Sequence, residues 1–299
     1  MLWWLAGCLL LAEPPTLVED GPVPSNRAGR DTDEEDTETG DDTGEETDTA
    51  EELGDPVFVG VGNNDACVVY ASGAVRCSTY QDPPRGGGFV SINGGFYGYC
   101  GQADDGALTC TTDDAPPEEA RQVDVGSDYA CAVQAAGTLA CWGNNSEGKS
   151  DPPGASGWAK VALGPYTACA VTDAGALRCW GDDYFDVDVP PSGTFVDVAL
   201  HFTRGCGIRE GGSLACWGSG DDPPPREGEF KAIAAGASHF CALATDGSVA
   251  CWGDDDDQQA SPPSATFVQI DAGGNGTCGI TDDAELRCWG DVEMEGLEG

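Results

Sequence analysis

Cysteine is the residue type in this sequence with the most chemistry open to it, because thiols can bind metal ions, catalyse redox reactions or form disulfides. Zinc sites favour short Cys-x2–4-Cys spacings with histidine, and thiol redox catalysis favours Cys-x-x-Cys. The sequence has neither spacing. Instead, all but one of its 15 cysteines form pairs whose partners are ten positions apart: Cys67 and Cys77, Cys100 and Cys110, Cys131 and Cys141, Cys169 and Cys179, Cys206 and Cys216, Cys241 and Cys251, Cys278 and Cys288. We therefore predict seven structural disulfides, formed outside the reducing cytoplasm.

Other residues with catalytic potential do not form a recognisable motif. The only histidines, His201 and His239, lie five and two residues before the first cysteine of their repeats. A metal-binding pair is conceivable, but we favour ordinary repeat positions. The sequence contains neither a Gly-x-Ser-x-Gly nucleophile motif nor a His-Glu-x-x-His metal motif. We therefore predict that the protein is not an enzyme.

The cysteine pairs belong to seven copies of one unit. Six of the seven copies have glycine five residues before the first cysteine, and the fifth copy has His201 there. Six copies also have glycine six residues after the first cysteine, and Trp-Gly follows the second cysteine in the last five. A period near 35 residues is typical of solenoids and propellers, and ring closure removes exposed strand edges. We predict an all-β, seven-bladed propeller.

The third copy predicts the strand register around each disulfide. If Ala135 to Gly137 form a hairpin loop with Gly137 in the left-handed conformation, Val133 pairs with Leu139 and Cys131 with Cys141. The cysteines are then a closely spaced, non-hydrogen-bonded pair, and Trp142 lies on the opposite face. Both faces are apolar, so neighbouring units must cover them. The last copy stops soon after its Trp-Gly, so its outer part is either missing or supplied by the stretch around Pro56 to Val59.

The segment HFCALATDGSVACWG, residues 239–253, resembles the repeats of the regulator-of-chromosome-condensation family. The short period is closer to the bacterial β-lactamase-inhibitor propellers of that superfamily. The resemblance covers residues 56–299 and implies a seven-bladed propeller used as a rigid binding platform. The cysteine pairs are additional to the usual motif. Together with the acidic composition, they argue against a nuclear exchange-factor role.

The first twelve residues resemble an export signal. Leu5-Ala6-Gly7-Cys8 is similar to the lipobox of bacterial lipoproteins, in which the cysteine is lipidated. Only seven residues precede Cys8 and none is basic, which a misassigned start site would explain. The alternatives are an ordinary cleaved signal or a chance apolar start. Residues 2–12 are too short to span a membrane as a helix.

Residues 13–55 differ in composition from the repeats. They carry 17 acidic residues against two arginines and no aromatic residue, so we expect a disordered linker. Residues 56–299 carry 36 acidic and 11 basic groups, part of a net charge of −40 for the chain. This charge repels nucleic acid and favours cations or basic protein partners, although it also serves solubility.

Function in repeat proteins resides mainly in the segments that break the repeat, here the connectors after Trp-Gly. We predict a protein-binding loop with two aromatic rings among acids, formed by Asp182, Asp183, Tyr184, Phe185 and Asp186. A second connector could hold a divalent cation such as calcium through Asp254, Asp255, Asp256 and Asp257. For both segments, the alternative is a solvated loop.

These observations predict an exported, lipid-anchored monomer that binds another protein or an envelope component. Its parts are a signal segment (1–12), a linker (13–55) and the propeller (56–299). We expect no cofactor, calcium excepted, and no membrane contact beyond the lipid. The alternatives are a secreted enzyme acting on polysaccharide or a calcium-dependent adhesin.

Overall fold

The computed structural model describes residues 53–78, 82–96, 98–112, 116–117, 119–182, 185–220, 223–225 and 227–297. In these residues, twenty-one strands form seven antiparallel sheets of three strands, which we number as blades 1 to 7. A short 3-10 turn, η1 (Ser146–Gly148), follows β9. The strands are β1 (Pro56–Val61), β2 (Ala66–Tyr70), β3 (Val75–Cys77), β4 (Phe89–Gly95), β5 (Gly98–Ala103), β6 (Leu108–Cys110), β7 (Ala120–Val125), β8 (Tyr129–Gln134), β9 (Leu139–Gly143), β10 (Trp158–Leu163), β11 (Thr167–Thr172), β12 (Leu177–Gly181), β13 (Phe195–Leu200), β14 (Arg204–Arg209), β15 (Leu214–Gly218), β16 (Phe230–Ala235), β17 (His239–Ala244), β18 (Val249–Gly253), β19 (Phe267–Gly273), β20 (Gly276–Thr281) and β21 (Leu286–Gly290).

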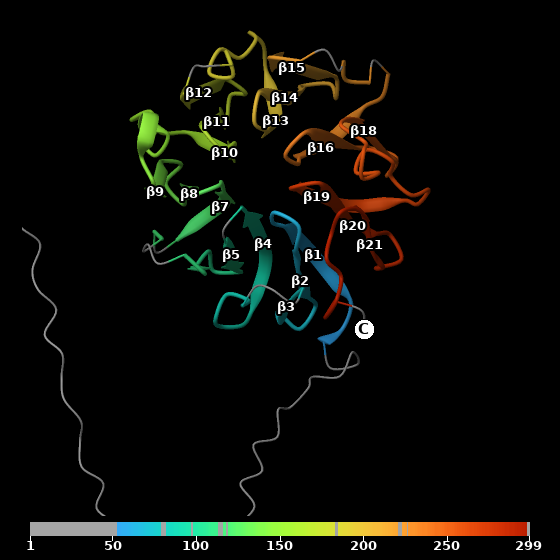
Figure 1. Ribbon diagram of the computed structural model, residues 1–299. Helices are drawn as coiled ribbons and strands as arrows, with labels where there is room; N and C mark the ends of the chain where they lie inside the picture. Colours follow the sequence, from blue (N-terminus) through green and yellow to red (C-terminus); the bar gives the residue numbers. More distant parts are fainter. Residues whose placement is uncertain are drawn as a thin grey trace, which may run out of the picture. The chain divides into compact units, whose positions relative to one another are not determined.

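The seven sheets form a ring around a central channel, with the first strand of each blade innermost (Figure 1). The prediction of an all-β, seven-bladed propeller is therefore confirmed. Figure 1 also shows β1 beside β19, so the two ends of the repeat region meet. No helix in the described part of the chain has the length and apolar character needed to cross a membrane.

One of the two alternatives for the outer part of blade 7 was wrong. Residues 56–61 do not add an outer strand to blade 7, because β1 pairs with β2 and is the inner strand of blade 1. The reason is local: a short turn after Val61 returns the chain at once into β2, which favours antiparallel pairing within one blade. Blade 7 has its own three strands, and the ring closes through contacts of β1 with β19 and β20.

The predicted register around the disulfides is confirmed. In blade 3, Cys131 lies opposite Cys141 and Val133 opposite Leu139, and Gly137 has a φ of 74°. The cysteine Cα atoms are 4.0 Å apart, as expected for a non-hydrogen-bonded pair. All seven disulfides join cysteines ten residues apart.

Each disulfide packs between two blades. Cys131 and Val133 lie with Trp158 and Val161 of blade 4 in one apolar cluster, whereas Trp142 packs toward Cys100 of blade 2. The same arrangement recurs at every blade boundary, including the one between blades 7 and 1. Blades of this size cannot bury apolar surface alone, so closure of the ring is what completes each cluster.

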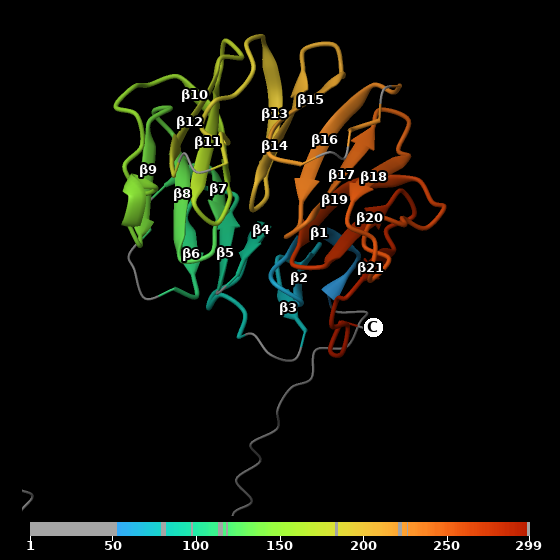
Figure 2. The same ribbon diagram turned by 45° about the horizontal axis from the view of Figure 1, so that its top comes forward.

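Antiparallel pairing gives the ring two different faces, because the first and third strands of a blade end on the same side. We call this side the loop face. It carries the turns after the inner strands and the residues that follow each third strand. The hairpin face carries the turns between second and third strands. Figure 2 shows the blades obliquely, with the strands running between the two faces.

Candidate functional site

Polar side chains of the inner strands line the channel. In the register of the sheets, Asn93, Asp124 and Asp271 lie opposite the first cysteines of blades 2, 3 and 7. Together with Gln122 and Gln269 they border a cavity of about 330 Å³. The channel therefore contains ionisable groups that neither the cysteine pattern nor the loop composition indicated.

Much of this polar lining connects one blade to the next. The Gln122 side chain accepts a hydrogen bond from the Val161 N–H (2.9 Å) and donates one to the Val161 carbonyl (3.0 Å). Gln269 makes the equivalent pair with Val59, at 3.1 and 3.0 Å. The inner strands do not pair directly, so these amides satisfy backbone groups that a neighbouring strand would otherwise bind. They also fix the spacing of the blades around the channel.

Two carboxyl groups in the channel have strongly shifted pKa values. Burial raises the pKa of Asp124 to about 7, against the lowering effect of the Leu163 N–H, which donates to it at 2.7 Å. Burial likewise raises the pKa of Asp271 to about 7, and the Val61 N–H donates to it at 2.7 Å. Both groups lie deep in the ring but remain partly accessible through the channel.

The raised pKa of Asp124 predicts a pH-dependent effect of Asp124→Asn. Folding favours the protonated carboxyl, so the wild type loses stability as the pH rises from about 4 through 7. The variant removes this loss and should be more stable than wild type at pH 8, with little difference at pH 4. We expect a gain of about 1–2 kcal/mol, less than the full shift implies, because channel water screens the charge.

Melting temperatures at pH 4, 6 and 8 check this prediction. Val196→Ala serves as the control, because Val196 is exposed and carries no ionisable group, and it should leave the pH profile unchanged. His201 and His239 titrate in both proteins, so their contributions cancel in the difference. Equal differences between Asp124→Asn and wild type at pH 4 and pH 8 would contradict the shift.

The loop-face end of the channel opens into a cavity of about 360 Å³ with aromatic walls. Phe96, Tyr166 and Phe202 line it, and these side chains are 43, 39 and 45% exposed. The rings of Tyr166 and Phe202 meet edge to face, with centroids 5.1 Å apart. The ring centroids of Phe185 and Phe202 are 6.5 Å apart. We call these four residues the aromatic mouth.

Glycines at the ends of the inner strands create this opening. A Cβ on Gly95 would lie 2.3 Å from the Gly126 carbonyl oxygen, and one on Gly273 would lie 1.9 Å from the Gly62 oxygen. Neighbouring backbones can therefore converge around the axis only if these positions lack side chains. The residues that follow the glycines form the rim of the cavity.

The two histidines lie near this cavity and are neutral at pH 7. Burial lowers the pKa of His201 to about 4, and its ring lies 4.6 Å from that of Phe240. Burial also lowers the pKa of His239 to about 4, and its Nε2 lies 2.7 Å from Thr277 Oγ1. Their contacts are those of packed side chains, which agrees with ordinary repeat positions.

The predicted binding loop contributes to the aromatic mouth. The loop begins beside Tyr166, because the Asp182 N–H donates a hydrogen bond to the Tyr166 carbonyl at 3.1 Å. The ring of Phe185 packs near the ring of Phe202. Asp186 is exposed. Asp183 and Tyr184 lie outside the described residues, as does Cys8.

The structure does not bring the four predicted calcium-binding aspartates into a common site. Asp254 to Asp257 are exposed. Asp255 accepts hydrogen bonds from the Ala260 N–H (2.9 Å) and Ser261 Oγ (2.8 Å), and Asp257 from Asn275 Nδ2 (3.0 Å). Across the described ranges, no group of three or more His, Cys, Asp or Glu side chains could hold a metal ion.

Phe96, Tyr166 and Phe202 are the site residues that the sequence reasoning missed. A signal was present: they stand three or four residues before a first cysteine, one or two residues after the position that glycine occupies in six of the seven copies. Only the ring shows that these variable positions meet at one opening.

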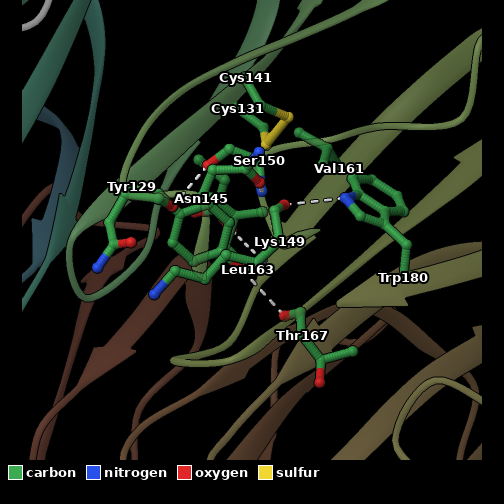
Figure 3. The surroundings of a disulfide bond; sticks show 12 residues. Tyr129, Cys131, Cys141, Asn145, Lys149, Ser150, Val161, Leu163, Thr167 and Trp180 are labelled. Atoms are coloured by element: carbon green, nitrogen blue, oxygen red, sulfur yellow. Dashed lines mark hydrogen bonds between the residues drawn. A yellow bond between two sulfur atoms is a disulfide. The ribbon is translucent and has the colours of Figure 1, made fainter. Parts of the chain in front are cut away.

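Residues Gly143 to Ser150 match the Gly-x4-Gly-Lys-Ser pattern of phosphate-binding loops, but the structure gives them a packing role. The Lys149 side chain is 3% exposed, and its Nζ lies 2.5 Å from Asp128 Oδ1. The Lys149 carbonyl accepts a hydrogen bond from Trp180 of the next blade at 2.9 Å (Figure 3). The Ser150 N–H donates a hydrogen bond to the side-chain oxygen of Asn145 at 3.0 Å, so this N–H is not available to bind a phosphate group.

Residues 158–186, 230–259 and 267–291 match the model of the regulator of chromosome condensation (RCC1) repeat. These three segments resemble RCC1 repeats, and the chain as a whole is a seven-bladed propeller. The ectodomain of the Arabidopsis thaliana receptor kinase ACR4 has a similar structure, with a TM-score of 0.67, 20% identity and coverage of 80% of this chain and 96% of that one. The CR4 ectodomain of Physcomitrella patens has a TM-score of 0.62 and 22% identity, with coverage of 78% of this chain and 73% of that one. Prp20p of Saccharomyces cerevisiae has a TM-score of 0.61 and 13% identity, with coverage of 80% of this chain and 83% of that one. These likenesses establish the fold, and no curated protein matches the sequence.

Proposed function

We propose that this protein is an exported scaffold that binds a protein partner at the aromatic mouth. The observation that carries the proposal is the set of exposed rings, Phe96, Tyr166 and Phe202, around one concave opening. Large exposed aromatic side chains at a cavity are typical of binding hot spots. A ring stapled by seven disulfides holds them in fixed positions, which reduces the entropy lost on binding.

Several observations support an extracytoplasmic location. Seven intra-blade disulfides require an oxidising compartment, and two structural neighbours are ectodomains. Prp20p is described as binding Gsp1p and histones, so a propeller of this fold can bind proteins. In this proposal Cys8 carries the lipid and residues 13–55 are the spacer between membrane and propeller. The short repeat fits the bacterial branch of the superfamily.

Substitution of the aromatic mouth tests the proposal. Partners are captured from native envelope and medium fractions with oxidised residues 47–299, which comprise the whole compact unit. We expect Tyr166→Ala/Phe202→Ala to weaken capture about tenfold or more, because hot-spot aromatics each contribute roughly 2 kcal/mol or more.

Val196→Ala is the matched control, since Val196 is 53% exposed but lies at the start of an inner strand, toward the hairpin face. Equal capture by the double variant and by this control would refute a site at the mouth. Retention of glycan in place of protein would favour a secreted enzyme that acts on polysaccharide. Loss of capture when a chelator is added would favour a calcium-dependent adhesin.

A further inference from the structure

Both faces of the ring carry many acidic side chains, but the basic side chains that offset them lie mostly toward the hairpin face. Acidic side chains dominate the described loop face. They are Asp65, Asp128, Glu147, Asp182, Asp186, Asp254, Asp255, Asp256, Asp257, Asp291, Glu293 and Glu295. The described basic residues on this face are Lys149 and Arg204. Most other described basic residues lie in strands, toward their hairpin-face ends: Arg76, Arg121, Lys160, Arg178, Arg209, Lys231 and Arg287.

The acidic side chains of the loop face outnumber its two described cations. Lys149 is buried against Asp128, and its ammonium lies 5.1 Å from the centre of the Tyr129 ring. Arg204 is partly buried and lies beside Gly220. The loop face therefore keeps an excess of negative charge around the aromatic mouth.

The aromatic mouth continues outward into a second depression past Phe202. This groove is lined by His201, Phe202, Arg204 and Asp254, and it has a volume of about 580 Å³. On the other side of the mouth, Asp182 lies directly beside Tyr166. Aromatic rings thus stand between carboxylates along one path across blades 4 to 6.

We propose that the occupant of the aromatic mouth is a cationic segment of the partner, with an arginine or lysine side chain against Tyr166 and Phe202. Ring faces attract cations, and guanidinium groups also stack on them. Flanking basic residues would be attracted to the acidic side chains of the loop face, among them Asp254 in the groove. This inference rests on the proposed function, because it names the chemistry of the partner at the same site.

The complementary charges predict which ligands the site rejects. Phosphate-rich and acidic ligands meet repulsion from a face on which acidic side chains outnumber basic ones. A neutral apolar segment could contact the rings but would gain no attraction from this charge. Binding of the cationic segment should therefore weaken with salt, since screening acts on these exposed charges.

Three matched peptides test this inference. Each is a capped octapeptide of glycine and serine with three variable positions, filled by arginine, glutamine or glutamate. Affinity for residues 47–299 is measured by fluorescence anisotropy at 50 and 500 mM NaCl. We expect the arginine peptide to bind at least about tenfold more tightly than the glutamine peptide at low salt, and the glutamate peptide not to bind.

Variants separate a specific site from general attraction to an acidic protein. Phe202→Ala and Asp254→Asn should each weaken binding of the arginine peptide severalfold, whereas Val196→Ala and Asp283→Asn, which lie toward the hairpin face, should not. Equal binding of the arginine and glutamine peptides, or no effect of Phe202→Ala, would overturn the inference.

Competition distinguishes this failure from failure of the proposed function. The arginine peptide should displace the natural partner captured by the scaffold. If Tyr166→Ala/Phe202→Ala abolishes capture but neither the arginine peptide nor 500 mM salt does, the binding site stands and the cationic partner is refuted. If the double variant does not affect capture, the proposed function itself fails.

Discussion

Gly273→Ala should lower the free energy of unfolding by about 3 kcal/mol or more, because the added methyl group would clash with blade 1 where it meets blade 7. The added Cβ would lie 1.9 Å from the Gly62 carbonyl oxygen and 2.7 Å from that of Val61. Both are backbone atoms of the first blade, so no flexible side chain can move aside. Relief requires separation of the inner strands that Gln269 and Asp271 connect.

Urea unfolding followed by tryptophan fluorescence measures this effect. Gly154→Ala is the matched control, since nothing lies within 4 Å of its Cβ position and its φ is not positive. The control should remain within about 0.5 kcal/mol of wild type. Equal stabilities of the two variants would show that blades 7 and 1 can separate at this point without loss of stability, and that the ring does not depend on this contact.

Removal of one disulfide should also have a large effect. Cys206→Ala/Cys216→Ala opens a loop of eleven residues, whose closure is worth roughly 3 kcal/mol in the chain-entropy model. Cys206 is fully buried at the boundary of blades 5 and 6, so the lost sulfur atoms add a packing defect. We expect the midpoint of thermal unfolding to fall, and complete reduction of all seven bridges to prevent refolding.

Peptide mapping without reduction provides the control for this experiment. Each cysteine of the wild type should be linked to the cysteine ten residues away, and the double variant should retain the other six links. Links between blades would contradict the register on which the prediction depends. An unchanged melting midpoint in the double variant would show that neighbouring blades, rather than the cross-link, hold blade 5.

Local sequence patterns were enough to predict the blade and its cross-link. A fixed spacing of ten residues with glycine at one turn position allows one hairpin register, so Cys131 opposite Cys141 follows from local geometry. The same local pattern placed Trp142 on the face away from the disulfide, and repetition predicted seven blades. These features depend on contacts within about a dozen residues.

How the blades meet depends instead on long-range packing. One of the two alternatives that the sequence left open put residues 56–59 in the outer part of blade 7, whereas the structure makes them part of the inner strand of blade 1. The raised pKa of Asp124 depends on burial inside a closed channel, which no local pattern reveals. Phe96, Tyr166 and Phe202 lie far apart in the chain and converge because the ring directs equivalent turns toward one axis. Repetition fixes the order of these turns, but the packing between blades fixes their distance from the axis and therefore the site.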